Sequence, residues 1–297
     1  MLKASRFFLF FLSFTIPFSP LAHDNSEQQL ASDTANIVNL VVPGGSDSKT
    51  VRNPFVAELL MLIFEKNQKT VSIEYVQQRL LQGRALKELA DNNLINLTWS
   101  ATTREREQQL AAIKIPIYQG LIGWRVLMIH PDSQIKFAQD SSLHALKSLL
   151  GVQQFDWPDY KVLTSNGFTV EGNIDFLTMS KTLQDKLIDY FPRSVLEIGR
   201  ELDLPRNEGL IAEKHLLFKY PSAYYFFVNK NDKKLHQLIE QGFKLAIADG
   251  SYQRLFGRYF NKQLRQLALS QRRVVELTNP TVDRNSFATN PNYWYKP

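Results

Sequence analysis

The sequence predicts an α/β fold made of two successive sets of strands and helices. Short apolar runs rich in β-branched residues alternate with longer segments whose apolar residues recur at helical spacing, which is typical of parallel sheets covered by helices. Residues 114–123, "KIPIYQGLIG", interrupt the alternation, and a second set begins after them. With 297 residues, 44% of them hydrophobic, the chain is long enough for both sets.

The first set starts with the β-branched run "IVNLVV", which predicts a buried strand over 37–42. A loop follows, and Pro54 opens a helix over 54–66 with apolar residues at helical spacing. The rest of the set is expected as a strand over 69–76, a helix over 77–91 and a strand over 94–99.

The second set repeats the alternation and ends in two long helices. Pro192 predicts the start of a helix, and Gly250 separates the last two helices. The expected strands are 124–130, 151–154, 168–170, 187–191 and one or two within 216–229; the expected helices are 141–150, 158–166, 174–185, 192–202, 233–250 and 251–270.

The first residues resemble a secretory signal peptide. A basic start, the apolar stretch "FFLFFLSFTI" and a plausible cleavage site near Ala22 predict a signal peptide over 1–22, followed by a polar, flexible leader over 23–36. The apolar stretch is shorter than the roughly 20 residues of a membrane span, so we expect a periplasmic chain that does not insert into the membrane.

Composition excludes several kinds of chemistry. The chain has no cysteine, which rules out disulfides, thiol catalysis and Cys-ligated zinc. Lys3 and Arg6 carry two of the six net positive charges, and the remaining excess is scattered, so nucleic acid is not an expected partner. The five histidines lack metal-ligand spacing, and Asp156 and Asp159 are interpreted as helix-cap residues. We therefore expect no metal, no cofactor and no catalytic residues.

The turn "TWSATTRERE", residues 98–107, places two arginines at the start of a helix, where the free N–H groups already attract anions. Thr102 is expected to cap this helix in a capping box with Glu105. Ser100, Thr103 and Arg106 are then available to bind a carboxylate or phosphate. Alternatively, the arginines belong to a solvated surface and pair with neighbouring glutamates.

This turn resembles the signature of type 2 periplasmic solute-binding proteins of the polar amino-acid class. By resemblance, Arg106 holds the carboxylate of the ligand, with Thr103 and Glu105 at the other positions of the motif. The segment "LAIADGSYQRLFGRYF", residues 245–260, is similar to the closing helices of the same family. The resemblance covers roughly residues 37–262.

The resemblance implies a two-lobed fold, each lobe a mostly parallel sheet flanked by helices, with a hinge of two crossings near 117–124 and 217–226. Lobe one would then comprise 37–121 plus 222–277, and lobe two 122–221. The tail, 278–297, contains four aromatic residues and is expected to pack across a surface.

Lobe two departs from the family pattern. Family members place a carboxylate after a strand to hold the ligand's amino group, whereas "LIDYFPRSV" has Pro192, Arg193 and Ser194 in that region. Arg193 is expected just inside a helix N-terminus, either as a surface arginine paired with Glu197 or as a second cleft arginine. The second reading predicts a ligand with two anionic groups, or with one carboxylate and many hydroxyls.

Other candidates for the cleft are aromatic. Such side chains stack on ring or apolar parts of a ligand, although packing in the core is an equally ordinary role. The candidates are Trp99, Tyr118, Trp157 and Tyr190, and Arg52 in the first loop is a further candidate.

The leading functional hypothesis is an exported solute-binding protein that closes two lobes on a small polar, anionic ligand. Its expected partners are an ABC permease of the inner membrane or a membrane sensor, and it is expected to be a monomer. A sensory or interaction module that is not coupled to transport is the alternative, and an enzyme on the same scaffold is a third reading.

Overall fold

Two parallel strands and two helices form the first part of the fold. In the computed structural model, which describes residues 36–44 and 53–296 except the side chain of Arg79, β1 (Ile37–Gly44) pairs in parallel with β2 (Thr70–Arg79). Helix α2 (Pro54–Lys66) connects them, and α3 (Gln82–Ala90) follows. The predicted signal peptide, almost all of the leader and Arg52 lie outside the described residues.

The second sheet of this region has the order β3-β11-β4. Strand β11 (Tyr224–Val228) returns from the other half of the molecule and pairs antiparallel with β3 (Thr98–Ala101) and β4 (Ala111–Ile113), with the short helix α4 (Arg104–Gln109) between these two. Strand β3 therefore begins later than the predicted 94–99. Asn96, which precedes it, bonds β1 through its side chain, at Val41 and Asn39, and through its backbone N–H, which donates to the carbonyl of Val41 (3.0 Å).

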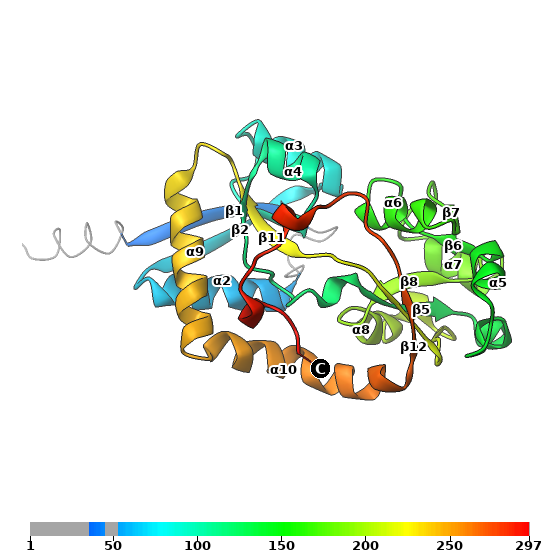
Figure 1. Cartoon of the computed structure of the whole chain (residues 1–297). Helices are drawn as coiled ribbons and strands as arrows, with labels where there is room; N and C mark the ends of the chain where they lie inside the picture. The colour runs from blue at the N-terminus through cyan, green and yellow to red at the C-terminus, as the bar shows by residue number, and fades with distance from the viewer. Residues whose placement is uncertain (1–35, 45–52, 297) are drawn as a thin grey trace, which may run out of the picture. The chain divides into compact units, whose positions relative to one another are not determined.

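The other half contains a sheet of order β12-β10-β5-β8, with β9 also paired to β5 (Figure 1). Its strands are β5 (Trp124–Ile129), β8 (Phe191–Ser194), β9 (Ile211–Ala212), β10 (Leu216–Lys219) and β12 (Arg273–Glu276). A smaller parallel pair, β6 (Leu150–Val152) and β7 (Thr169–Glu171), lies beside it. The helices are α5 (Leu143–Ser148), α6 (Pro158–Ser165), α7 (Met179–Gln184) and α8 (Ile198–Leu202).

Two predictions in this half are wrong. Strand 187–191 lies instead over Phe191–Ser194, and the helix expected from Pro192 begins only at Ile198. Strand β8 occupies the edge of its sheet, where a proline without an N–H group is tolerated. Arg193 is thus a strand residue and not the first residue of a helix.

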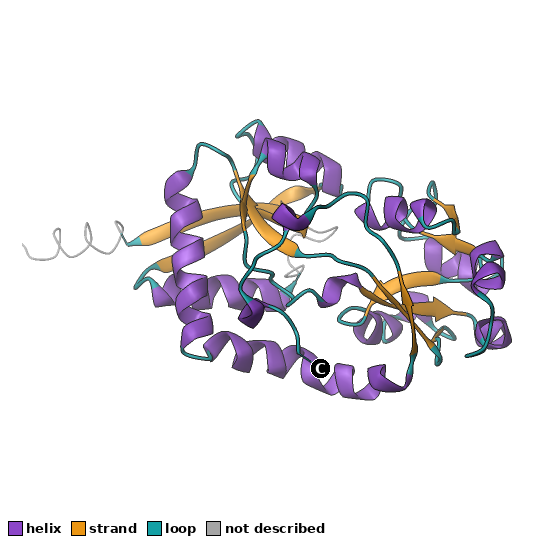
Figure 2. Cartoon of the chain, in the orientation of Figure 1, coloured by secondary structure: helices purple, strands orange, loops and turns teal. Residues whose placement is uncertain are grey.

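Two long helices, α9 (Lys233–Ala248) and α10 (Ser251–Gln266), follow β11 and are separated at Gly250, whose φ of 74° is left-handed. Helix α9 packs against α2, and α10 runs on to the half that contains β5, where the Gln263 amide donates to the carbonyl of Val195 (2.5 Å). The chain then forms β12, which was not expected. Figure 2 shows the loops and short turns that follow β12.

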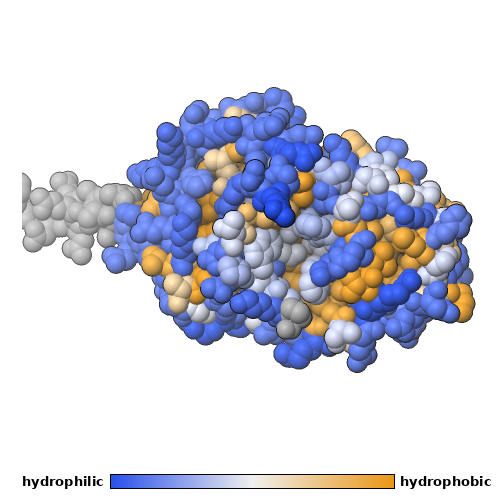
Figure 3. Space-filling view, viewed as in Figure 1, coloured by the Kyte–Doolittle hydropathy of each residue, from blue (hydrophilic) through white to orange (hydrophobic). Residues whose placement is uncertain are grey.

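Short 3-10 turns complete the described chain; they are η1 (Leu121–Gly123), η2 (Pro131–Phe137), η3 (Pro205–Asn207), η4 (Leu269–Gln271), η5 (Arg284–Ser286) and η6 (Pro291–Tyr293). On the face in Figure 3, hydrophilic residues gather over α3 and α4, and an apolar area lies over the half that contains β5. None of the described helices is both long and apolar enough to cross a membrane.

Candidate functional site

A cavity of about 290 Å³ lies between residues of the two halves. Asn53, Trp99, Tyr118 and Tyr224 line it from the half that contains β3 and β11, and the other half contributes Arg125, Trp157, Asp159, Phe176, Arg193 and Glu197. Pro43, Leu80, Leu81, Gln82, Ala85, Thr98 and Gln154 complete the lining. The volume is close to the lower end of the range of small-molecule sites.

Arg125 and Asp159 form a buried ion pair in this cavity. Arg125 Nη2 lies 2.5 Å from Asp159 Oδ1, and Arg125 Nε donates to the hydroxyl of Tyr220 (2.9 Å), which itself donates to Asp159. Strand β5 supplies the arginine and the first turn of α6 the aspartate. Burial raises the pKa of Tyr220 well above its ordinary value, so this hydroxyl stays protonated as a donor.

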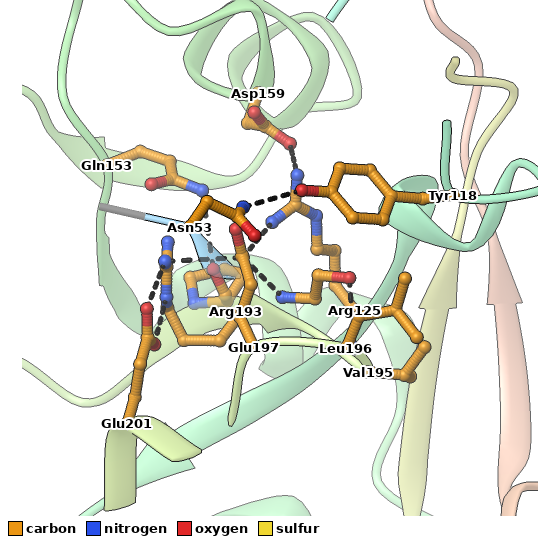
Figure 4. Close-up of polar contacts among 12 residues, drawn as sticks. Asn53, Tyr118, Arg125, Gln153, Asp159, Arg193, Val195, Leu196, Glu197 and Glu201 are labelled. Atoms are coloured by element: carbon orange, nitrogen blue, oxygen red, sulfur yellow. Dashed lines mark hydrogen bonds and ion pairs between the residues drawn. The ribbon is translucent and has the colours of Figure 1, made fainter. Parts of the chain in front are cut away.

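Arg193 is paired with two glutamates, Glu197 and Glu201 (Figure 4). Three aromatic rings also lie near its guanidinium. Its Nε and Nη2 each lie 2.6 Å from an oxygen of Glu201, which makes the contact bidentate. The guanidinium carbon lies 4.6 Å from the ring centre of Phe191, with Trp157 and Phe176 further away. Arg193 combines parts of both expected roles, because it pairs with Glu197 and also lines the cavity. It is buried and not on the surface, and its charge is already paired.

Glu197 joins the two arginines. Its Oε2 lies 3.2 Å from Arg193 Nη2 and 3.4 Å from Arg125 Nη1, and it accepts the backbone N–H of Ser194. Burial alone would raise the pKa of Glu197, but the two arginines hold it below its ordinary value. Two arginines thus face three carboxylates, which leaves this wall of the cavity without an excess of positive charge.

The opposite wall is aromatic and uncharged. Asn53 caps α2 by accepting the N–H of Val56, and its Nδ2 donates to the hydroxyl of Tyr118 (2.7 Å). The ring of Tyr118 packs edge-on against Tyr224. Burial raises the pKa of Tyr224 to about 12, so both hydroxyls are neutral hydrogen-bonding groups in this wall.

Within the described residues, the guanidinium of Arg106 makes its hydrogen bonds to neutral groups. Its Nη1 donates to Ser100 Oγ (2.5 Å) and to the carbonyl of Ala101 (2.7 Å), and its Nη2 donates to Gln82 Oε1 (2.8 Å). Burial lowers the pKa of Arg106, yet no described carboxylate is bonded to its guanidinium. Among the cavity residues, Gln82 is the one that touches it.

The predicted cap of α4 needs a correction. Thr103, and not Thr102, is the N-cap, and its hydroxyl accepts the N–H of Arg106 (3.2 Å). Thr102 donates to Glu107 Oε1 (2.5 Å), so the expected capping box with Glu105 does not form. Glu105 instead reaches Lys161 of α6 at 3.9 Å.

The structure thus brings together only part of the predicted site. Trp99, Tyr118, Trp157 and Arg193 line the cavity, whereas Ser100, Thr102, Thr103 and Arg106 lie outside its lining. Tyr190 packs in the core against Phe137 and Phe218.

Three charged residues of the cavity were missed. An arginine inside the apolar run "WRVLMIH" was the available signal for Arg125, while Asp159 and Glu197 looked like ordinary helix residues. Within 36–44 and 53–296, no group of three His, Asp or Glu residues is arranged to hold a metal ion.

Comparison with protein-family models and with curated proteins finds no match. Solved structures match across 74–79% of this chain. An arginine-specific periplasmic binding protein of Salmonella typhimurium is 13% identical, with a TM-score of 0.54 over 76% of this chain and 99% of that one.

A histidine kinase sensor domain similar to periplasmic binding proteins is 14% identical (TM-score 0.57; 76% of this chain, 97% of that chain). The GluR0 ligand-binding core of Nostoc punctiforme, in complex with glutamate, is 16% identical (TM-score 0.53; 74% and 98%). At such identities the comparison establishes the fold: the chain has the two-lobed α/β fold of type 2 periplasmic solute-binding proteins. The resemblance seen in the sequence is confirmed at that level.

Proposed function

We propose that this chain is an exported, periplasmic solute-binding protein that holds a small polar ligand between its two lobes. The observation that carries the proposal is the cavity itself, because both lobes line it and it joins aromatic walls to fixed polar groups. Lobe one is proposed to comprise 37–121 plus 222–277 and lobe two 122–221, except that β12 pairs with β10 and so belongs with lobe two.

The charges of the site favour a ligand with one anionic group rather than two. Arg193 and Arg125 are neutralised by their own carboxylates, which removes the reason to expect a second anion at lobe two. Arg106 is different, because its partners are neutral and a carboxylate or phosphate that replaced Gln82 would gain a charged hydrogen bond.

The rest of the ligand is proposed to donate hydrogen bonds. Among the described residues, the side-chain bonds of Asp159 go to Oδ1, and those of Glu197 go to Oε2. The second oxygen of each is proposed to accept a ligand N–H or O–H. Trp99 and Trp157, on opposite lobes, offer flat surfaces to the ligand's carbon skeleton. A zwitterionic amino acid meets these conditions. Its cationic amino group would not be repelled by Arg193, because the charge of Arg193 is already paired with a carboxylate.

An ABC permease or a membrane sensor is the proposed partner, and the chain is proposed to act as a monomer without catalytic activity. A sensory role without transport is the second candidate, which the similarity to a histidine kinase sensor domain favours.

The proposal is tested by a thermal-shift screen with amino acids, dicarboxylates, sugar acids and phosphorylated metabolites. A ligand at 100 times its Kd stabilises the folded protein by about 2.7 kcal/mol. We expect a hit that Arg106→Ala abolishes and that Arg84→Ala, which removes an exposed arginine paired with Glu88, leaves unchanged. A hit that survives Arg106→Ala contradicts the assigned anion position, and no hit in the whole library contradicts the solute-binding function.

A further inference from the structure

The residues after β12 connect the two lobes a further time. The hinge crossings run from β4 to β5 and from β10 to β11, and within the described chain α10 then leads to β12 in lobe two, after which the C-terminal segment returns to lobe one (Figure 1). We call residues Leu277–Tyr295 the strap.

The strap is fixed first to lobe two. Leu277 is buried in a core cluster of that lobe, and its N–H donates to the carbonyl of Lys219 (2.8 Å). The side chain of Asn166, at the end of α6, donates to the carbonyl of Thr278 (2.8 Å) and accepts its N–H (3.1 Å). Asn279 then bonds the carbonyl of Pro221 in the second crossing (2.8 Å).

Lobe one holds the strap only three residues later. The N–H of Arg104, the first residue of α4, donates to the carbonyl of Thr281 (3.0 Å), and its guanidinium donates to the carbonyls of Pro280 (2.8 Å) and Val282. Tyr225 of β11 then donates to the carbonyl of Ser286 (3.0 Å).

The end of the strap packs against the first crossing. Trp294 and Phe287 are partly buried and pack against a core cluster of lobe one, and the N–H of Tyr295 donates to the carbonyl of Gln119 (2.9 Å). A Cβ built on Gly120 would lie 2.7 Å from the ring of Trp294, so the ring contacts the backbone of the crossing directly. The strap is therefore anchored on both lobes, by the buried Leu277 on lobe two and by the partly buried Phe287 and Trp294 on lobe one.

Its length limits the movement of the lobes. Thr278 and Thr281 are three residues apart, so their Cα atoms cannot separate by more than about 11 Å even when fully extended. Their partners are Asn166, the C-cap of α6, and Arg104, the first residue of α4. The first turn of α6 lines the cavity, and α4 follows β3, whose Thr98 and Trp99 line it. The helices cannot move apart beyond this length unless the bonds at one end break.

We propose that the strap is a tether that limits opening of the cleft, and that ligand exchange requires its release from α4 or α6. The inference of a tether depends on the contacts alone. Its effect on ligand exchange rests on the proposed function. The lobes of the unliganded protein therefore sample one narrow range of separations.

Distance measurement between spin labels tests the tether without any ligand. Because the chain has no cysteine, labels can be placed at Lys87→Cys on α3 and Lys181→Cys on α7, both exposed. We expect a single narrow distance distribution for the full chain. A broad distribution, or two populations, in the unmodified strap would overturn the proposal.

Lengthening the strap is the decisive variant, because it removes no side chain. It separates Asn279 from Thr281, which are hydrogen-bonded within the strap, but it keeps the residues that bond α6 and α4. Four Gly/Ser residues inserted between Asn279 and Pro280 add up to about 14 Å of reach, and we expect a longer-distance population to appear. The matched control places the same insertion between Glu208 and Gly209, which are exposed and distant in sequence from the strap. An unchanged distribution after the strap insertion would refute the tether.

A second pair of variants covers the case in which the insertion does not fold. Asn166→Ala and Arg104→Ala each remove side-chain bonds at one end of the strap. We expect each to broaden the distribution, whereas Arg258→Ala, which removes a surface ion pair with Glu58, leaves it unchanged. If neither strap variant differs from Arg258→Ala, the proposal is wrong.

Discussion

Arg193 offers a direct test of how the site is built. Replacement by methionine keeps a long side chain among Phe191, Trp157 and Phe176 but removes the charge. Glu201, whose side chain is 12% exposed, then loses its bidentate partner. The variant distinguishes two roles of Arg193: stabilising the folded protein through its ion pair, or remaining available to bind a ligand.

The magnitude follows from the burial of the pair. Removing one partner of a buried ion pair leaves an uncompensated charge, which costs about 3–5 kcal/mol of unfolding free energy. In a domain of this size each kcal/mol lowers Tm by about 2–4 °C, so Arg193→Met should lower it by about 6–20 °C. Lys181→Met is the control, because its exposed pair with Asp185 contributes only about 0–1 kcal/mol.

Urea unfolding of the unliganded protein measures both variants, and Arg193→Met/Glu201→Met completes a double-mutant cycle. The double variant should recover most of the lost stability, because no unpaired carboxylate remains. If Arg193→Met changes the unfolding free energy no more than Lys181→Met does, Arg193 is not a structural ion-pair partner and the two-anion ligand becomes the better hypothesis.

Three further predictions concern other parts of the structure. Arg106→Lys should weaken binding of an anionic ligand by at least about tenfold, because an ammonium cannot keep the fork of bonds to Ser100, Ala101 and a ligand oxygen; isothermal titration measures it. Gly120→Ala should cost more than about 1 kcal/mol, because φ is 79° and the added methyl meets Trp294; thermal unfolding measures it. Unfolding free energy should fall between pH 10 and pH 12, because burial raises the pKa of Tyr224 to about 12 while the unfolded tyrosine ionises near 10; urea titrations at each pH measure it.

Each of these has a control. Gly209→Ala is matched to Gly120→Ala, since its φ is also left-handed but nothing lies within 4 Å of the added methyl; equal costs would mean that Trp294 is not packed on the crossing. For the tyrosine, the neutral form is favoured in the folded state, so its contribution is complete below pH 10; Tyr224→Phe should reduce the loss above pH 10, and an identical pH profile would contradict the assignment. Unchanged affinity in Arg106→Lys would mean that the ligand does not contact this guanidinium.

The sequence was sufficient where local signals agree with tertiary packing. Helix α2 begins at Pro54, and α9 and α10 separate at Gly250, as predicted. It was insufficient at Pro192, where the same residue that starts helices lies in the edge strand β8. An edge position is a property of the sheet and cannot be read from one strand.

The charged residues of the site could not be predicted from the sequence for a related reason. Arg125, Asp159 and Glu197 are 34 and 38 positions apart along the chain, and only the pairing of β5 with β8 and the position of α6 bring them together. The sequence shows that Arg193 is charged but not that this charge is paired. Its partner, Glu201, lies eight residues further on and across a turn. A sequence motif can indicate a candidate arginine, whereas the fold determines which arginines are already paired with carboxylates.

The ion pairs and the strap have the same effect: both reduce the conformational freedom of the site before a ligand binds. Arg193 and Arg125 are held by carboxylates, so the conformational entropy of their side chains is lost on folding and not on binding. The strap restricts the separation of α4, which contains Arg106, and α6, which contains Asp159. Because these side chains are ordered before binding, more of the free energy of the ligand contacts contributes to affinity. Dissociation of the ligand then becomes the slow step of exchange. Slackening the strap should therefore raise the dissociation rate constant more than the association rate constant, a ratio that stopped-flow measurement with the first confirmed ligand determines.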